Sequence, residues 1–411
     1  MKRTKYIVLG AGPAGITFAN RLKLNGEEDF IVLEKEVEAG GLCRSKIVDG
    51  AAFDIGGGHF LDVRRPKVVE FLFSFMGQEE WNLYERDSRI MLGDGVEVHH
   101  PIEANIWEMN IEKQIEYLVS IAKAGCNLGE KMPNKFVDWI YWKLGKQIAK
   151  EYMIPYNQKM FADELNNLGT YWLEKLPNVS FEETLKSCLT HRAYGTQPGH
   201  ASFYYPKKYG YGEVWLRMAE NIKNHIEYEV QIKGIDFATK TVTSYTGEMY
   251  QADVIITTIP WEEFEEVNGD SGIVKKNISK LCYSSIETRY YPENLDTTAH
   301  WIYYPNLSVP YHRILVRHNF LDKSKGYWTE TRKERVSMFP KEKDNYTYIN
   351  EYAYPINTID KPHAIAEILN FARNSKVYGL GRWGEHEHFN SDVVVERAMD
   401  LADELSLRCK V

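Results

Sequence analysis

The first forty residues contain two apolar runs separated by a stretch with helical spacing. Residues 6–9 and 30–33 are continuously apolar, and residues 16–24 between them carry apolar side chains at the spacing of one helix face. Continuous apolar runs are typical of parallel strands that helices cover on both faces. The start of the chain is therefore predicted to form a strand–helix–strand unit of a parallel sheet.

Later apolar segments are predicted to return to this sheet. Three of them are strand-like and lie at 226–232, 241–244 and 250–260. A last strand near residue 377 leads through a glycine-rich turn into a helix at 393–405. We therefore predict an α/β fold with a Rossmann-like domain that is discontinuous in sequence, formed by residues 1–75, 205–265 and 365–411.

The segments between these pieces have different periodicities. Residues 111–124 and 136–152 carry apolar side chains at helical spacing, so residues 76–204 are predicted to form a mainly helical inserted domain. The chain after residue 266 instead alternates between apolar and polar positions, with Pro and Asn between the runs. Residues 266–364 are therefore predicted to form an antiparallel sheet that offers one face to a substrate.

A glycine-rich turn joins the first strand to the first helix. Gly10, Gly12 and Gly15 fit the pattern G-x-G-x-x-G, and Glu34 ends the second strand. In this pattern the first glycine permits a tight turn, the second lets the backbone approach a pyrophosphate, and the third lets the helix pack on the strand. The helix N-terminus favours phosphate, and an acid at the end of the second strand binds ribose hydroxyls. The segment is therefore predicted to bind a dinucleotide.

Composition and charge exclude several functions. Lys and Arg number 50 and Asp and Glu number 58, so the net charge is −8 and no nucleic-acid partner is expected. No apolar run is long enough to cross a bilayer, so no membrane span is expected. The five cysteines are scattered without CxxC spacing. The sequence thus predicts a cytoplasmic protein with reduced thiols and no metal site.

Two segments resemble the cofactor contacts of flavin amine oxidases, phytoene desaturases and UDP-galactopyranose mutases. After Glu34, Gly40 and Gly41 resemble a loop that passes close to FAD, and Arg44 is placed to contact the phosphates. In these enzymes a strand like the one near Val230 approaches the adenine. The resemblance therefore implies that the glycine-rich turn binds FAD rather than NAD.

Two further segments resemble the surroundings of the flavin ring in UDP-galactopyranose mutases. The first, Gly57-Gly58-His59, resembles a loop that carries a histidine beside the flavin. The second begins at Gly381-Arg382 and ends near Asn390. The resemblance implies that these residues contact the cofactor and that His59 shapes the environment of flavin N5.

Other segments resemble the substrate contacts of the same mutases. Tyr156 and Phe161 lie in a Tyr-x-x-Lys-x-Phe segment, where the mutases usually end in tryptophan. Tyr304 belongs to a Trp-x-Tyr-Tyr-Pro pattern, and Arg313 follows Pro-Tyr-His shortly afterwards. The resemblance implies that Arg313 binds the substrate pyrophosphate, which suits a planar guanidinium. Tyr156, Phe161, Tyr304 and His388 are implied to complete the substrate site.

The resemblance implies a flavin-dependent isomerase of polysaccharide biosynthesis that interconverts pyranose and furanose forms of a nucleoside-diphosphate hexose. In this family the N5 of reduced FAD is the nucleophile at the anomeric carbon, and NADPH or NADH is the candidate reductant. Catalytic roles fall to His59 and Arg313, and Arg289 and Arg317 are further candidates for holding the diphosphate. Because Arg313 lies outside the predicted cofactor domain, its replacement is expected to leave FAD content and melting temperature near wild type.

Some positions depart from the mutase pattern. His388 stands where a tyrosine is usual, and Asn390 where bacterial members have aspartate. No arginine at 170–183 matches the second substrate-binding arginine of the family. The alternative is an FAD-dependent oxidoreductase of the amine oxidase or desaturase type, which shares the N-terminal pattern. The sequence leaves open the sugar, the nucleotide, the reductant and whether the chain forms a homo-oligomer.

Overall fold

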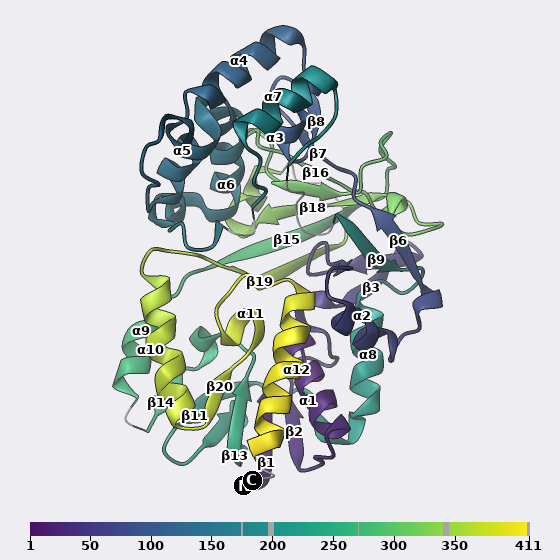
Figure 1. Cartoon of the computed structure of the whole chain (residues 1–411). Coiled ribbons are helices and arrows are strands. Elements are labelled where there is room, and N and C mark those ends of the chain that lie inside the picture. Colours follow the sequence, from purple (N-terminus) through teal and green to yellow (C-terminus); the bar gives the residue numbers. More distant parts are fainter. Residues whose placement is uncertain (174–175, 196–200, 270, 340–344, 409–411) are drawn as a thin grey trace.

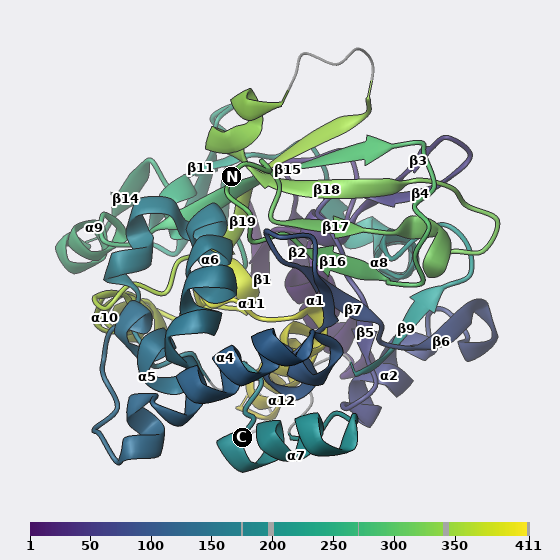
Figure 2. The ribbon, with the colours of Figure 1, turned by 90° about the horizontal axis from the view of Figure 1, so that it is seen from above.

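The structure is a computed structural model that describes residues 1–173, 176–195, 201–269, 271–339 and 345–408. An α/β part carries both termini, a second sheet crosses above it, and a helical part packs beside that sheet (Figure 1). Seen from above, the helical part and the second sheet lie side by side over the α/β part (Figure 2). Three parts of the chain therefore meet near the centre of the molecule.

The α/β part is built on an eight-stranded sheet with the order β10-β2-β1-β13-β12-β11-β14, in which β20 also pairs with β13. The strands are β1 (Lys2–Leu9), β2 (Phe30–Leu33), β10 (Ile226–Glu227), β11 (Ile232–Asp236), β12 (Thr241–Ser244), β13 (Met249–Thr257), β14 (Glu266–Asn268) and β20 (Val377–Gly379). β1 runs parallel to both of its neighbours, β2 and β13. The predicted α/β class with a Rossmann-like sheet is confirmed.

Helices cover both faces of this sheet, which explains the continuous apolar run of β1. Tyr6 and Val8 join the core beneath α1 (Pro13–Leu24), α8 (Gly212–Asn221) and α12 (Ser391–Arg408). Ile7 and Leu9 join the core on the opposite face, beneath α9 (Gly272–Ile278) and α10 (Lys361–Asn374). Each side chain of β1 from residue 6 to residue 9 is therefore buried.

The second sheet has seven strands in the order β19-β15-β18-β17-β16-β7-β8. They are β7 (Ser88–Met91), β8 (Glu97–His99), β15 (Tyr283–Tyr291), β16 (Trp301–Tyr303), β17 (Arg313–Leu315), β18 (Tyr327–Arg332) and β19 (Thr347–Pro355). All neighbouring pairs are antiparallel except β7 with β16. β7 and β8 come from the segment that was expected to be mainly helical, and the alternating burial of β7 explains their place in a sheet.

The helical part carries α3 (Ile102–Asn105), α4 (Ile111–Ala122), α5 (Phe136–Ile148), α6 (Ile154–Phe161) and α7 (Phe181–Thr190). A π-helical turn, Ala149–Met153, joins α5 to α6. Lys159 on α6 is fully buried and donates to the carbonyls of Tyr304 and Tyr311 at 2.6 and 2.8 Å. This amine fastens the helical part to the β16–β17 connection.

Smaller elements link the α/β part to the second sheet. They are the hairpin β3 (Ser45–Val48) with β4 (Ala51–Asp54), the strands β5 (Leu61–Asp62), β6 (Trp81–Glu85) and β9 (Ser202–Pro206), and the helices α2 (Pro66–Phe73) and α11 (Gly381–Gly384). The guanidinium of Arg317 is fully buried and donates to the carbonyls of Val48 and Lys325. It therefore anchors the β3–β4 hairpin to the second sheet.

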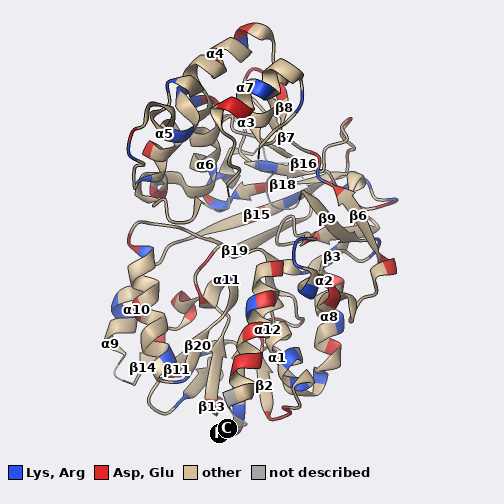
Figure 3. Ribbon diagram, viewed as in Figure 1, with Lys and Arg blue, Asp and Glu red and all other residues tan. Residues whose placement is uncertain are grey.

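The structure shows how the charged residues and the cysteines are distributed. Acidic and basic residues are interspersed over the helices at both ends of the molecule (Figure 3). Within the described ranges, no helix combines the length and apolarity needed to cross a membrane. Four cysteines there are free thiols, whereas Cys409 lies outside the described residues. The same part of the chain holds no cluster of three or more metal-binding side chains.

Candidate functional site

The glycine-rich turn between β1 and α1 forms a cradle of bare backbone. A Cβ on Gly15 would overlap the carbonyl oxygen of Gly10, so helix α1 could not pack as closely with any side chain there. A Cβ on Gly12 would meet nothing nearer than the Cα of Gly41 at 3.8 Å. The space beside Gly12 is therefore open, as a bound pyrophosphate requires.

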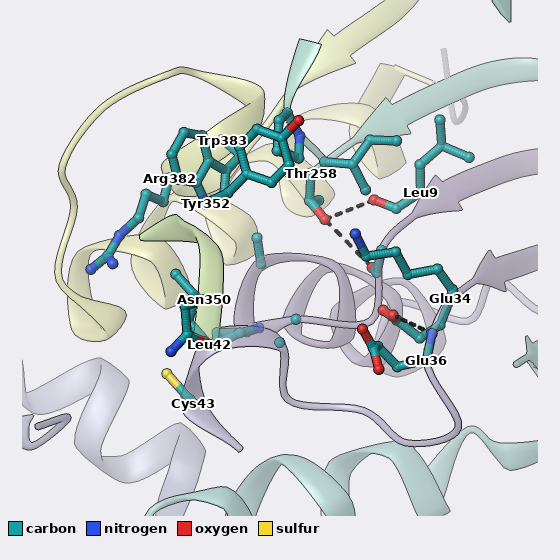
Figure 4. A pocket seen from close by; sticks show the side chains of 18 of the residues that line it. Leu9, Glu34, Glu36, Leu42, Cys43, Thr258, Asn350, Tyr352, Arg382 and Trp383 are labelled. Atoms are coloured by element: carbon teal, nitrogen blue, oxygen red, sulfur yellow. Dashed lines mark hydrogen bonds between the residues drawn. The ribbon is translucent and has the colours of Figure 1, made fainter. Parts of the chain in front are cut away.

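This cradle opens into a cavity of about 290 Å³ that extends along the carboxyl end of the first sheet. Glu34 and Glu36 lie at one end of it, and Arg382, Tyr352 and Trp383 gather at the other (Figure 4). The elongated arrangement has acidic groups at one end, bare glycine backbone in the middle and aromatic groups at the far end. These residues fit a dinucleotide cofactor.

The acidic end of the cavity suits a ribose. Glu34 is buried, and its carboxylate accepts hydrogen bonds from the backbone N–H of Ala11 at 2.6 Å and of Glu36 at 2.9 Å. Burial raises the pKa of Glu34, whereas these two N–H groups oppose that rise. Val230 lines the cavity here, and its N–H donates to the carbonyl of Glu34 at 2.9 Å. The predicted positions of Glu34 and Val230 therefore meet at one end.

Arg44 lies in the cavity wall, but protein groups already occupy much of its guanidinium. It donates to the carbonyl of Gly41 at 3.0 Å, to Glu36 at 3.2 Å and to the hydroxyl of Tyr348 at 2.7 Å. These bonds tie the Gly40–Gly41 loop to β19 of the second sheet. Arg44 is thus placed as a structural clamp at the middle of the cavity, in addition to its expected role toward phosphate.

The C-terminal segment closes the far end of the cavity. Gly381 approaches α1 so closely that a Cβ would lie 2.6 Å from the Cβ of Ala14. Arg382 donates to the carbonyls of Phe389 at 2.8 Å and Ala353 at 3.1 Å, which holds the turn that follows α11. Asn390 is exposed, and its carbonyl accepts from the N–H of Val394 at the start of α12. Arg382 therefore lines the cavity, whereas the predicted cofactor contacts Gly381 and Asn390 are not part of its lining.

The loop 57–59 brings His59 to this end of the cavity. Gly57 has a φ of +93°, and a Cβ there would lie 2.6 Å from Oε1 of Glu330; a Cβ on Gly58 would overlap Leu315. Nδ1 of His59 donates to the carbonyl of Gly57 at 3.1 Å, which leaves Nε2 as an acceptor. Burial, with Arg382 nearby, lowers the pKa of His59 to about 3. His59 is therefore neutral at physiological pH.

Arg313 on β17 lies next to this loop. Its Nε and Nη2 donate to Oε2 of Glu330 on β18 at 3.1 and 2.5 Å. Only 19% of the Arg313 side chain is exposed, and Glu330 is fully buried. Burial alone would raise the pKa of Glu330, but Arg313 and His312 bring it down to about 2. The site therefore holds an ionised pair in a nearly dry environment.

Tyrosines from three elements surround Arg313. Tyr303 lies directly opposite Arg313 in the β16–β17 register, and its ring centre is 5.4 Å from that of Tyr156 on α6. Tyr354 on β19 packs against His388 with ring centres 4.8 Å apart. Burial raises the pKa of Tyr156 well above its ordinary value and that of Tyr354 to about 12. These two hydroxyls therefore stay protonated and can donate hydrogen bonds to an anion.

Two residues of the predicted substrate site do not join this group. Tyr304 belongs to a separate apolar cluster, where its ring lies 5.0 Å from that of Tyr311, and its neighbour Tyr303 takes the place beside Arg313. Phe161 is buried in the core of the helical part. A strand exposes alternate residues on opposite faces, so an assignment that is off by one residue selects the wrong face.

Sequence reasoning missed a second arginine of the group. Arg86, between β6 and β7, donates to the hydroxyl of Tyr303 at 3.3 Å and lies 3.1 Å from Nδ1 of His100. Burial lowers the pKa of Arg86, and Arg313 is close enough to lower it further. Tyr303 thus bonds to Arg86 and lies opposite Arg313 in the sheet. The other two candidate arginines have different partners, because Arg317 is anchored to backbone carbonyls and Arg289 pairs with Glu287.

Sequence comparisons find relatives of the N-terminal segment. Residues 8–75 match the family model of an NAD(P)-binding Rossmann-like domain. Over 52 residues, 13% of the chain, identity is 42% with Baeyer-Villiger monooxygenase peniC of Penicillium patulum, covering 8% of that protein. Over an equal length it is 46% with an uncharacterized protein in the nifH2 3′ region of Methanothermococcus thermolithotrophicus, covering 49%. The match therefore spans less than half of either curated relative.

Solved structures match nearly the whole chain. A reduced UDP-galactopyranose mutase aligns with a TM-score of 0.86 and 22% identity, over 98% of this chain and 93% of that one. A fatty acid isomerase from P. acnes aligns at 0.67 with 15% identity, over 98% of both chains. A putrescine oxidase variant aligns at 0.62 with 12% identity, over 98% and 99%. The predicted resemblance is thus confirmed at the level of architecture, and the chain has the fold of UDP-galactopyranose mutase.

Proposed function

We propose that the protein is an FAD-dependent nucleotide-sugar mutase that interconverts pyranose and furanose forms of a nucleoside-diphosphate hexose. The observation that carries the proposal is the group formed by Arg313, Arg86 and their tyrosines beside the His59 loop. It combines partly buried cations with neutral hydroxyl donors next to a dinucleotide cavity. An anionic sugar nucleotide needs this chemistry, whereas an amine or a hydrocarbon does not.

The cofactor is assigned to the cavity along the first sheet. Gly12, Gly41 and the N-terminus of α1 would hold the pyrophosphate, and Glu34 would bind the ribose of the adenosine. His59 and Arg382 line the opposite end. When bound and reduced, FAD supplies the nucleophile for the anomeric carbon. NADPH or NADH is the proposed source of the electrons.

Arg313 and Arg86 have the task of holding a diphosphate that leaves the sugar and returns to it. In the described residues, Nη1 of Arg313 makes no hydrogen bond, so one edge of its guanidinium is free for a phosphate oxygen. Tyr156 and Tyr354 are protonated and can donate to the same anion. A water-poor setting strengthens each of these contacts.

His59 would serve as a neutral acceptor rather than as a cation. Its Nδ1 proton is engaged by Gly57, so Nε2 can accept a hydrogen bond from a ligand N–H or O–H. Because its pKa is lowered to about 3, the ring does not compete with Arg313 for the diphosphate charge. The proposed reaction at the sugar would then take place beside a neutral His59 ring, with no fixed positive charge at that residue.

A turnover assay tests the proposal against the oxidoreductase alternative. The purified holoenzyme is incubated with a panel of UDP-, GDP- and dTDP-hexoses under three conditions: without reductant in air, with NADPH in air, and with dithionite in the absence of oxygen. We expect a furanose product only in reduced samples, with many turnovers per reducing equivalent. Stoichiometric consumption of oxygen or of a nicotinamide for each product would instead support an oxidoreductase and refute the mutase proposal.

A further inference from the structure

Glu330 is a fully buried carboxylate in the middle of the second sheet. It lies on β18, opposite Arg313 of β17 and Thr288 of β15. An ionised carboxylate is costly to bury unless charge and hydrogen bonds compensate it. The contacts of its two oxygens therefore define what this residue does for the site.

The two oxygens of Glu330 serve two different structural parts. Oε1 accepts a hydrogen bond from the backbone N–H of Gly58 at 2.9 Å. Gly58 belongs to the loop that carries His59. Oε2 accepts from Nε and Nη2 of Arg313, and Nε2 of His312 lies 3.5 Å from the same oxygen. One carboxylate thus joins the cofactor loop to the residue proposed to bind the substrate anion.

The loop is built to receive this carboxylate. A Cβ at Gly57 would lie 2.6 Å from Oε1, so a larger residue would push the loop away from Glu330. Arg313 and His312 keep the carboxylate ionised although it is buried. A phosphate at the open edge of Arg313 must therefore share the guanidinium with Glu330, whose negative charge stays close to that of the ligand.

We propose that Glu330 is a positioning residue that couples anion binding at Arg313 to the His59 loop beside the cofactor. An anion on Arg313 draws the guanidinium toward itself and alters the Glu330–Gly58 contact, which changes the surroundings of the flavin. Coupling of this kind is reciprocal, so the state of the flavin also alters anion affinity. The proposal rests on the proposed function for the location of the anion and the cofactor.

The test titrates oxidised holoenzyme with UDP, with GDP and ADP alongside, and needs no turnover. Calorimetry measures the Kd, and difference absorbance measures the response of the flavin to the bound nucleotide. In wild type we expect binding together with a flavin difference spectrum. In Glu330→Gln we expect about tenfold tighter UDP binding, because a negative charge beside the ligand is lost, and a flavin response reduced by more than half.

Thr288→Val is the matched control. Thr288 faces the same side of the sheet, and its hydroxyl donates to the carbonyl of Ile55 at 2.8 Å, so it also ties the sheet to the chain before the His59 loop. It carries no charge, and its hydroxyl contacts the carbonyls of Ile55 and Tyr348 rather than Arg313. We expect its Kd and flavin response to match wild type. A second variant, Glu330→Asp, keeps the charge but shortens the reach to Gly58, so UDP affinity should stay near wild type while the flavin response falls.

The outcomes separate this proposal from the proposed function. If no nucleotide binds to wild type, the proposed function fails. If UDP binds to wild type without any flavin response, the coupling is refuted while the proposed function stands. Weaker or unchanged binding in Glu330→Gln with a full flavin response would likewise reject the coupling role. Should Glu330→Gln fail to fold, the wild-type spectrum and Glu330→Asp decide the question, and an unaltered response in Glu330→Asp overturns it.

Discussion

Breaking the Arg313–Glu330 ion pair should lower the free energy of unfolding by an amount that the structure allows us to estimate. Replacing Arg313 by Met removes the cation but leaves the Glu330 carboxylate fully buried. Breaking a buried ion pair by removing one partner costs about 3–5 kcal/mol. The N–H of Gly58 still donates to Oε1, so we place Arg313→Met near the lower limit, at about 3 kcal/mol.

The loss should depend on pH in a defined direction. In wild type the pKa of Glu330 is lowered from its ordinary value of 4.5 to about 2, so the pair stabilises the fold fully above pH 4.5. That stabilisation is lost as the pH falls toward 2. In Arg313→Met, burial without the cation should raise the pKa of Glu330 above 4.5. The stability difference between wild type and variant should therefore be largest at neutral pH and shrink on acidification.

A double-mutant cycle measures the prediction. Urea unfolding followed by circular dichroism is compared for wild type, Arg313→Met, Glu330→Gln and the double variant at pH 7. The double variant should be more stable than Arg313→Met, because no uncompensated charge remains buried. Additive effects of the two substitutions, or an Arg313→Met variant as stable as wild type, would refute the reasoning.

Three further predictions concern the cofactor and the anion. Gly12→Val should fold normally but lose FAD, whereas Gly15→Val should impair folding itself. Flavin absorbance after gel filtration and circular dichroism distinguish the two variants. Stoichiometric FAD in Gly12→Val would show that the pyrophosphate site is misassigned. Tyr303→Phe should raise the Kd for UDP by about 2- to 12-fold, which corresponds to the loss of one neutral hydrogen bond. Tyr304→Phe should leave the Kd unchanged in calorimetry. Equal effects would contradict the assignment of Tyr303 to the site and of Tyr304 to the opposite face of the sheet. Arg86→Met should weaken UDP binding by on the order of tenfold or more. Arg89→Met should not, because Arg89 pairs with Asp87 and Glu97 instead. An unaffected Kd in Arg86→Met would remove Arg86 from the site.

Local patterns predict the cofactor half of the molecule well. The apolar run of β1, the glycine turn and the end of β2 are adjacent in sequence, so the order of residue types contains the geometry. Gly57, Gly58 and His59 likewise form one short segment. The place of His59 in the same cavity wall as Gly12 and Arg382 could therefore be predicted without knowledge of long-range contacts.

Contacts that depend on strand register were harder to predict. Tyr303 and Tyr304 are neighbours in an aromatic run, and only the pairing of Tyr303 with Arg313 decides which of them faces the site. Arg86 lies far from Tyr303 in sequence and reaches it because β7 pairs in parallel with β16. No local signal marks such an arginine.

Glu330 shows why the effect of a single substitution could not be predicted. It stands in a strand of mixed polarity, where an acidic residue is normally expected to face solvent. The sequence placed Arg313 outside the cofactor domain, with no consequence for stability or flavin. The contacts of Glu330 with Arg313 and Gly58 reverse that expectation, because they link Arg313 to the loop beside the cofactor through one buried charge.

The most direct test of the mutase proposal follows the anomeric carbon–oxygen bond of the substrate. A nucleoside-diphosphate hexose carrying oxygen-18 in the bond between the sugar and the diphosphate is incubated with reduced holoenzyme and recovered before equilibrium. If the diphosphate leaves and returns at Arg313, the label should spread to non-bridging phosphate oxygens, and it should not do so with oxidised enzyme. A label that stays in the bridging position while the substrate is converted would contradict the account.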